Sequence, residues 1–215
     1  CIRDRIMPSE FIPICEDTGM IEELGRQVLE MGCRQAMEWS RLGLDIDVSI
    51  NISPRQFNDE GLMQALDDFS QTDGFPTGRL ELEITESVLI GDHELIAEKL
   101  EAITRMGYRI AIDDFGIGYS NLSYISRFPL KCLKIDRSFI QQLPKSGPII
   151  RLILTLADQI GATTVAEGVE REAECDWLSA QNCDQVQGFY FSRPIPLPEF
   201  MSAIKGLNAG LESID

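Results

Sequence analysis

The most constraining feature of this sequence is a regular alternation of short β-rich segments with longer segments of helical periodicity. Each β-rich segment is dominated by Val, Ile, Leu or Thr, and each is followed by apolar residues that recur at helical spacing. Such alternation predicts a parallel sheet with helical crossovers. The six expected strands cover residues 47–51, 80–85, 109–113, 130–135, 163–167 and 185–191.

The segments between these strands predict the helices that cover the sheet. Their ends carry helix-stop signals such as Gly107 and Gly161. A short helical piece is also expected after Gly118. The longer helices are predicted over residues 20–42, 60–70, 93–106, 149–160, 170–180 and 199–207.

A polar residue stands at or near the carboxyl end of every predicted strand. Buried charges need partners, so these positions are poor choices for an ordinary core. Polar residues at successive strand ends are typical of a (β/α) barrel active site, whereas a doubly wound sheet gathers its site at one switch point. A closed barrel has eight strands and about 250 residues, so the sequence falls about two strands short. The strand-end residues are Asn51, Glu83, Asp113, Lys134, Glu167 and Gln187.

Four carboxylates stand at or next to these strand ends. Glu83, Asp113, Asp114 and Glu167 are acidic, and Asn51 adds a neutral oxygen. Oxygen ligands without His or Cys fit a hard divalent cation such as Mg²⁺, Mn²⁺ or Ca²⁺. A single carboxylate could equally be a surface charge or a helix N-cap. The recurrence at strand after strand favours a shared metal site.

Lys134 is flanked by apolar residues in the segment Leu133-Lys134-Ile135-Asp136. It could complete an ion-pair network, with Asp136 as its expected partner. It could also position an attacking water or a phosphate oxygen. Both alternatives remain open from the residues alone. Nearby, Gly116 and Gly118 indicate a loop in which positive φ is needed.

The composition restricts the partners and the compartment. The formal net charge of −16 disfavours nucleic-acid polymers and anionic membrane surfaces, so a phosphate ligand would need a recruited positive ion. Six cysteines without a C-x-x-C pair and a single histidine argue against zinc and favour reduced thiols. No apolar run approaches the roughly 20 residues of a membrane span, and no signal peptide is evident. We expect a cytoplasmic protein, or the cytoplasmic part of a larger signalling protein, without membrane insertion.

Seven short motifs make the sequence similar to a known family. In order along the chain, and covering nearly all of it, this sequence resembles the EAL domain family of bacterial cyclic-di-GMP phosphodiesterases. The motifs are FIP at 11–13 with Glu16 and Gly19, NIS at 51–53, EITE at 83–86, DDFG at 113–116, KID at 134–136, AEGVE at 166–170 and QGF at 187–189.

The resemblance implies a fold, a reaction and residue roles. The family fold is a modified eight-stranded (β/α) barrel whose first strand is antiparallel. Its reaction is the metal-dependent hydrolysis of cyclic-di-GMP to the linear dinucleotide, with two divalent cations, Mg²⁺ or Mn²⁺. A homodimer is also implied. By resemblance, the metal ligands are Asn51, Glu83, Asp113 and Glu167, and Asp114 binds the second metal. Lys134 and Glu170 are implied to orient the attacking water, and Gln187 to order water. Glu86 is implied to anchor the loop 114–122.

Two departures from the family pattern lead us to expect an impaired activity of this chain. The E-A-L tripeptide and its following arginine are absent, and Ile117 stands where the family usually has Thr. We therefore expect residues 1–215 to form one EAL-type domain truncated at its N-terminus, with an incomplete barrel. The alternatives to a phosphodiesterase are a cyclic-di-GMP receptor without activity and an interaction domain without a nucleotide role.

Overall fold

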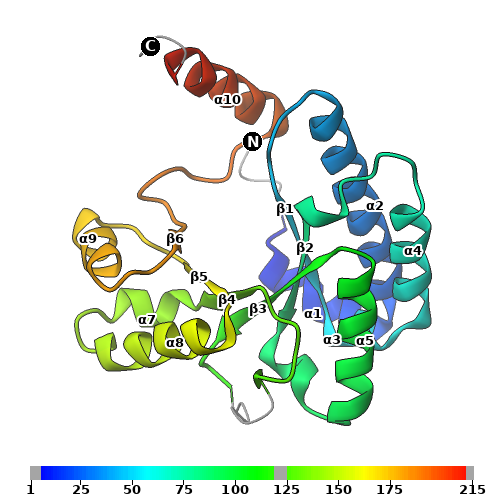
Figure 1. The fold of residues 1–215 in the computed structure, drawn as a ribbon, viewed down its shortest axis with the longest axis horizontal. Coiled ribbons are helices and arrows are strands. Elements are labelled where there is room, and N and C mark those ends of the chain that lie inside the picture. Colours follow the sequence, from blue (N-terminus) through cyan, green and yellow to red (C-terminus); the bar gives the residue numbers. More distant parts are fainter. Residues whose placement is uncertain (1–5, 119–124, 212–215) are drawn as a thin grey trace.

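Six parallel strands form the centre of the protein. The computed structural model describes residues 6–118 and 125–211. Each strand pairs in parallel with its neighbours in the sequence (Figure 1). The strands are β1 (Val48–Ile52), β2 (Leu80–Thr85), β3 (Arg109–Phe115), β4 (Cys132–Ile135), β5 (Thr163–Ala166) and β6 (Gln185–Val186).

The strand order distinguishes the two predicted architectures. The sheet runs from β1 to β6 in sequence order without a reversal. A doubly wound sheet would contain a switch point, so the order confirms a (β/α) barrel type of winding. Among the described residues the sheet is open, with β1 and β6 at its two edges.

Helices cover the sheet in two groups. Figure 1 shows α2, α4 and α5 beside β1, β2 and β3, and α7, α8 and α9 beside the later strands. No helix in the described part of the chain is long and apolar enough to span a membrane. The helices are α1 (Pro8–Thr18), α2 (Met20–Arg41), α3 (Pro54–Asn58), α4 (Glu60–Ser70), α5 (His93–Arg105), α7 (Arg137–Gln141), α8 (Gly147–Ile160), α9 (Glu172–Ala180) and α10 (Leu197–Leu211), with 3₁₀ turns η2 (Thr77–Arg79) and η3 (Glu86–Leu89).

The strands separate an apolar surface from a charged one. Leu82 and Ile84 of β2 face the helices and pack with Leu62, Leu100 and Ile103. The alternate residues of the same strand point the other way, because successive side chains of a strand lie on opposite faces. Apolar burial against the helices therefore fixes the register that sends the acidic side chains of β2 to the opposite face of the sheet.

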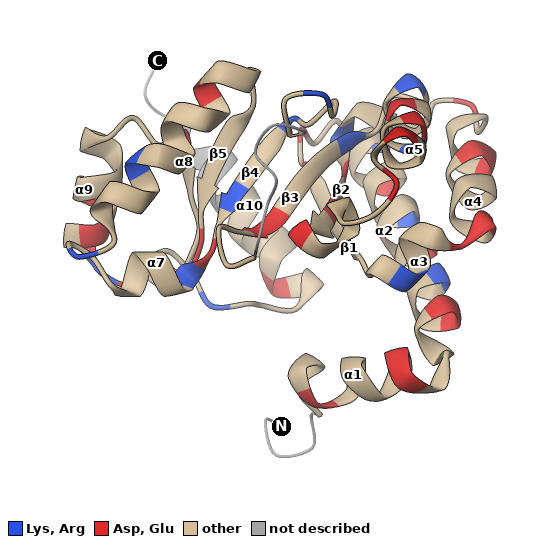
Figure 2. Cartoon of the chain, turned by 90° about the horizontal axis from the view of Figure 1, so that it is seen from below, with Lys and Arg blue, Asp and Glu red and all other residues tan. Residues whose placement is uncertain are grey.

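Several elements differ from the sequence-based expectation. Helices α1, α3 and α7 are not predicted by the apolar pattern. Helix α1 has no buried residue, and Figure 2 shows it standing away from the body of the domain. Helices α3 and α7 have five residues each, too few to display a helical period. The helical piece expected after Gly118 falls on residues 119–124, which lie outside the described residues.

The last predicted strand is too long. Only Gln185–Val186 pairs as β6, rather than residues 185–191. The chain turns immediately afterwards, because the Phe191 N–H donates to the Gly188 carbonyl and the Tyr190 N–H donates to the Val169 carbonyl. The carboxyl end of β6 therefore bends onto the loop that follows β5.

The C-terminal helix returns to the first part of the chain. Trp39 of α2 packs against Phe200 of α10, with ring centroids 5.5 Å apart. The indole Nε1–H of Trp39 also contacts the Met201 Sδ at 3.2 Å. Figure 1 shows α10 beside the end of α2, reached by a long segment after β6. This contact joins elements from opposite ends of the sheet order.

Candidate functional site

Lys134 is the centre of an acidic cluster at the carboxyl ends of the strands. Its side chain on β4 is only 8% exposed. The Lys134 Nζ lies 2.8 Å from the Glu83 Oε1, 2.7 Å from the Glu167 Oε1 and 3.5 Å from the Asp113 Oδ1. The side chains of β2, β3, β4 and the β5 end therefore converge, as their strand-end positions predict. Lys134 thus forms an ion-pair network, which is one of the two roles that its sequence position left open.

Asp114 adds a further carboxylate to the cluster. Carboxylate oxygens of Asp113, Asp114 and Glu167 all lie within 4.8 Å of one another. One lysine thus faces four carboxylates, when Glu83 is included. Oxygen donors with excess negative charge are the environment that Mg²⁺, Mn²⁺ or Ca²⁺ requires, so the residues fit a hard divalent cation.

The electrostatics of the cluster follow from burial and crowding. Burial, together with the neighbouring Asp113 and Asp136, raises the pKa of Asp114 to about 6. Burial also raises the pKa of Glu167, although Lys134 opposes this shift. Burial alone would lower the pKa of Lys134, but Glu83, Glu167 and Asp113 outweigh it and the pKa lies above its usual value. Lys134 therefore stays protonated at neutral pH.

The backbone of β3 is irregular where it carries the two aspartates. The pairing of β3 with β4 shifts between Ile112 and Phe115. Asp114 has φ +52°, in the left-handed region, and Gly116 has φ +98°. Such irregularities re-aim side chains at the end of a strand and occur next to functional sites. Here the irregularity brings two successive carboxylates to the same cluster.

Asn51, Gln187 and Glu170 lie at the margin of the cluster. Asn51 of β1 is directly opposite Glu83 in the strand register, and its side chain is exposed. Gln187 follows β6, where its N–H donates to the Ala166 carbonyl at 2.8 Å. Glu170 is exposed on the loop after β5. All three lie on segments that border the cluster. None of them has a side-chain contact with Lys134 in the described part of the chain.

Glu86 holds the loop that follows the two aspartates. Its buried carboxylate accepts hydrogen bonds from the backbone N–H of Gly116 at 3.2 Å and of Gly118 at 3.3 Å. A Cβ atom at Gly118 would lie 3.1 Å from the Glu86 carboxyl carbon, so this close approach suits glycine. The first part of the loop is thereby tied to η3.

The expected pairing of Asp136 with Lys134 is wrong. Asp136 is the N-cap of α7, and its Oδ1 accepts the backbone N–H of Ser138 at 2.8 Å. Its side chain also contacts Asp114. In a continuing strand Asp136 would share the face of Lys134, because residues two apart point the same way. Strand β4 ends at Ile135, however, and the Asp136 side chain caps the helix that begins at the next residue.

The sequence reasoning missed Glu174. This residue lies on α9 rather than at a strand end, and its side chain is 5% exposed. Its carboxylate accepts hydrogen bonds from the backbone of Glu170 and Arg171. The available signal was its spacing of three residues from the helix start, which is the spacing of a capping box.

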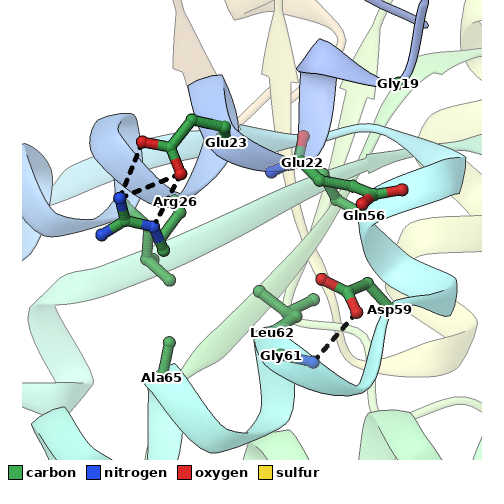
Figure 3. Close-up of a pocket in the computed structure, with 11 residues that line it drawn as sticks. Gly19, Glu22, Glu23, Arg26, Gln56, Asp59, Gly61, Leu62 and Ala65 are labelled. Carbon is green, nitrogen blue, oxygen red and sulfur yellow. Dashed lines mark hydrogen bonds and ion pairs between the residues drawn. The ribbon is translucent and has the colours of Figure 1, made fainter.

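Two cavities lie near the N-terminal helices. A cavity of about 380 Å³ extends from Asn51 and Thr85 to the apolar side chains of α1 and α2. A second, of about 300 Å³, lies between α2 and α4 (Figure 3). In Figure 3 its charged side chains are already engaged, since Glu23 pairs with Arg26 and Asp59 accepts from the Gly61 N–H. Only the first cavity reaches the carboxyl ends of the strands.

Curated relatives are similar in sequence over nearly the whole chain. Signaling protein YkoW of Bacillus subtilis (strain 168) is 41% identical over 196 residues, which cover 90% of this chain and 24% of YkoW. Cyclic di-GMP phosphodiesterase PdeR of Escherichia coli (strain K12) is 35% identical over 201 residues, which cover 92% of this chain and 30% of PdeR. The chain thus spans about a quarter to a third of the length of these relatives.

Solved structures and a family profile complete the comparison. A structure described as "PaMucR Phosphodiesterase, c-di-GMP complex" has a TM-score of 0.87 and 37% identity, covering 91% of this chain and 81% of that one. The EAL enzyme Bd1971, in its cAMP and cyclic-di-GMP bound form, has a TM-score of 0.85 and 32% identity, covering 93% of this chain and 56% of that one. The profile of the EAL domain matches residues 3–194. This chain therefore belongs to the EAL domain family.

Proposed function

We propose that this chain is a phosphodiesterase domain that binds cyclic-di-GMP and hydrolyses one of its phosphodiester bonds, with two divalent cations, Mg²⁺ or Mn²⁺. The observation that carries the proposal is a cluster of four carboxylates at the carboxyl ends of the strands, three of which lie against a single lysine, Lys134. This excess of negative charge cannot hold a phosphodiester without added cations. The relatives named for this activity support the choice of substrate.

The proposed ligands of the cations come from consecutive strands. Asn51, Glu83, Asp113 and Glu167 would hold one cation, and Asp114 would contribute to the other. Bound divalent cations supply charge neutralisation at the phosphate and lower the pKa of water. Glu83 and Asp113 present their oxygens from neighbouring strands that are locked by parallel pairing. The ligand set therefore rests on the sheet rather than on mobile side chains alone.

Lys134 has a distinct part in this proposal. Because its pKa lies above its usual value, the ammonium group donates hydrogen bonds and does not accept a proton. It holds the Glu83 and Glu167 oxygens in place and can donate to a water or a phosphate oxygen beside them. Glu170 and Gln187, from the loop after β5 and the end of β6, would complete the hydrogen bonding of the attacking water.

The cellular context is also part of the proposal. Residues 1–215 would act as a single EAL-type domain, as a homodimer, in the cytoplasm. Five cysteines in the described residues are free thiols, which suits a reducing compartment. The acidic composition disfavours nucleic-acid polymers as partners. Sedimentation with and without the dinucleotide would test the dimer.

The function is tested by turnover of cyclic-di-GMP with Mn²⁺ or Mg²⁺, followed by chromatography of the linear product. Each factor of ten in rate corresponds to about 1.4 kcal/mol. We expect Asp113→Asn to lower the rate at least about 100-fold, because a bound metal contributes several kcal/mol to the transition state. Binding of cyclic-di-GMP without turnover in the unmodified chain would overturn the enzyme proposal and favour the receptor alternative.

A further inference from the structure

The loop between β5 and α9, residues 167–171, carries two of the proposed site residues. Its first part is fastened to the sheet by the backbone. The Glu167 N–H donates to the Ile135 carbonyl and the Val169 N–H donates to the Gln187 carbonyl, both at 3.0 Å. Strand β4 and the segment after β6 therefore hold residues 167–169 from two sides.

The second part of this loop is held by Glu174. One oxygen, Oε2, accepts the backbone N–H of Glu170 at 2.9 Å and of Arg171 at 3.0 Å. The other, Oε1, accepts the Arg171 Nε–H at 2.8 Å and its Nη2–H at 2.5 Å. The Glu174 side chain is 5% exposed, so all four bonds belong to a buried carboxylate. Such a group keeps one position because its alternatives would leave a buried charge without donors.

The local fold explains why a glutamate is placed here. Glu174 is the third residue of α9, at the positive end of the helix, where backbone N–H groups lack helical partners. Burial alone would raise the pKa of Glu174, but the N–H groups of Glu170 and Arg171 and the Arg171 side chain lower it below the usual value. The carboxylate is therefore ionised at neutral pH and fixed on the loop.

We propose that Glu174 is a positioning residue of the site, which clamps the loop 167–171 so that Glu167 keeps its contact with Lys134 and Glu170 keeps its place on the same loop. This inference rests on the proposed function. Glu174 matches Glu86 in its chemistry, since each buried carboxylate accepts two backbone N–H groups from a loop at the carboxyl ends of the strands. Two loops that carry site residues are thus each held by a glutamate outside the cluster.

Three variants separate the clamp from a general structural role. Glu174→Ala removes the acceptor of both backbone N–H groups. Glu174→Gln keeps one oxygen to accept them but loses the ion pair with Arg171 and both hydrogen bonds from its side chain, because an amide NH2 replaces the second oxygen. The Arg171 side chain is 64% exposed and can turn to solvent, so this loss contributes little. Glu172→Ala is the matched control, because it removes an exposed acidic residue from the same first turn of α9.

The readouts are amide hydrogen exchange of Glu170 and Arg171, Mn²⁺ affinity by calorimetry, and kcat and KM for cyclic-di-GMP well below the melting temperature of each variant. We expect Glu174→Ala to speed exchange at both amides and to lower kcat or Mn²⁺ affinity by about 10–100-fold, the range for residues that orient metal ligands. Glu174→Gln and Glu172→Ala should stay near the unmodified protein.

Three results would overturn the proposal. They are unchanged exchange at the two amides in Glu174→Ala, a folded Glu174→Ala with unchanged kcat and Mn²⁺ affinity, or a Glu174→Gln variant as impaired as Glu174→Ala. Absence of turnover in the unmodified chain would count against the proposed function alone. The exchange and Mn²⁺ measurements would still decide the role of Glu174.

Discussion

The charge networks at the two ends of the same strands differ in burial and in how far their acidic residues are compensated. At the amino ends, Arg79 pairs with Asp45 and Asp47, and Arg109 lies 2.8 Å from the Asp47 Oδ2 and 3.7 Å from the Glu81 Oε2. Two arginines thus face three carboxylates, and most of these side chains are substantially exposed. Solvent screens the remaining negative charge there, so this network needs no added ion.

The carboxyl ends show the contrasting case. There a single buried lysine contacts three carboxylates, and a fourth, Asp114, lies in the same cluster. The deficit of positive charge lies in a partly buried place, where burial and the neighbouring Asp113 and Asp136 raise the pKa of Asp114 to about 6. The comparison teaches that acidic residues alone do not define a site. What distinguishes the carboxyl ends is uncompensated charge in a partly buried place.

The largest expected effect on stability is at Lys134. Replacing it in Lys134→Met leaves buried carboxylates without their cation, and we expect the free energy of unfolding in EDTA to fall by about 3–5 kcal/mol. The matched change at the amino ends, Arg79→Met, should cost only about 0–1 kcal/mol, because its partners are exposed. Urea unfolding of both variants makes the measurement. Equal losses would remove the distinction between the two ends.

A smaller effect is expected at Glu86. The variant Glu86→Ala frees the N–H groups of Gly116 and Gly118 and should loosen the loop after the two aspartates. We expect Mn²⁺ affinity or kcat to fall by about tenfold, the lower end of the range for residues that orient metal ligands. The neighbouring exposed change Ser87→Ala should have no such effect. Unaltered activity in Glu86→Ala would show that the loop is held without this anchor.

The sequence predicted the sheet better than its short helices. Strand β2 agrees with the expected range, because apolar residues alternate strictly over Leu80–Thr85 and solvent-free packing enforces that register. Helix α1 escaped prediction because it buries no residue, so its sequence has no core-facing period to detect. The strand pattern follows from burial, whereas α1 is delimited locally by Pro8 at its start and by Gly19, in the left-handed conformation, at its end.

The site shows the same division. The convergence of Glu83, Asp113, Lys134 and Glu167 followed from their position at strand ends, a property of the topology. The diversion of Asp136 to cap α7 and the left-handed φ of Asp114 depend on local backbone geometry that no apolar period records. Sequence reasoning therefore located the cluster without specifying which neighbours complete it.

The central claim is that cations bind at the carboxyl ends because charge is uncompensated there, and one strand offers the direct test. Glu81 and Glu83 lie two residues apart on the same face of β2, where Glu81 pairs with Arg109 of the amino-end network and Glu83 with Lys134 of the carboxyl-end cluster. We expect Glu83→Gln to weaken Mn²⁺ binding, measured by calorimetry, by at least about tenfold, because a negatively charged ligand is lost. The isosteric Glu81→Gln should leave it unchanged. Equal Mn²⁺ affinities in the two variants would contradict the account.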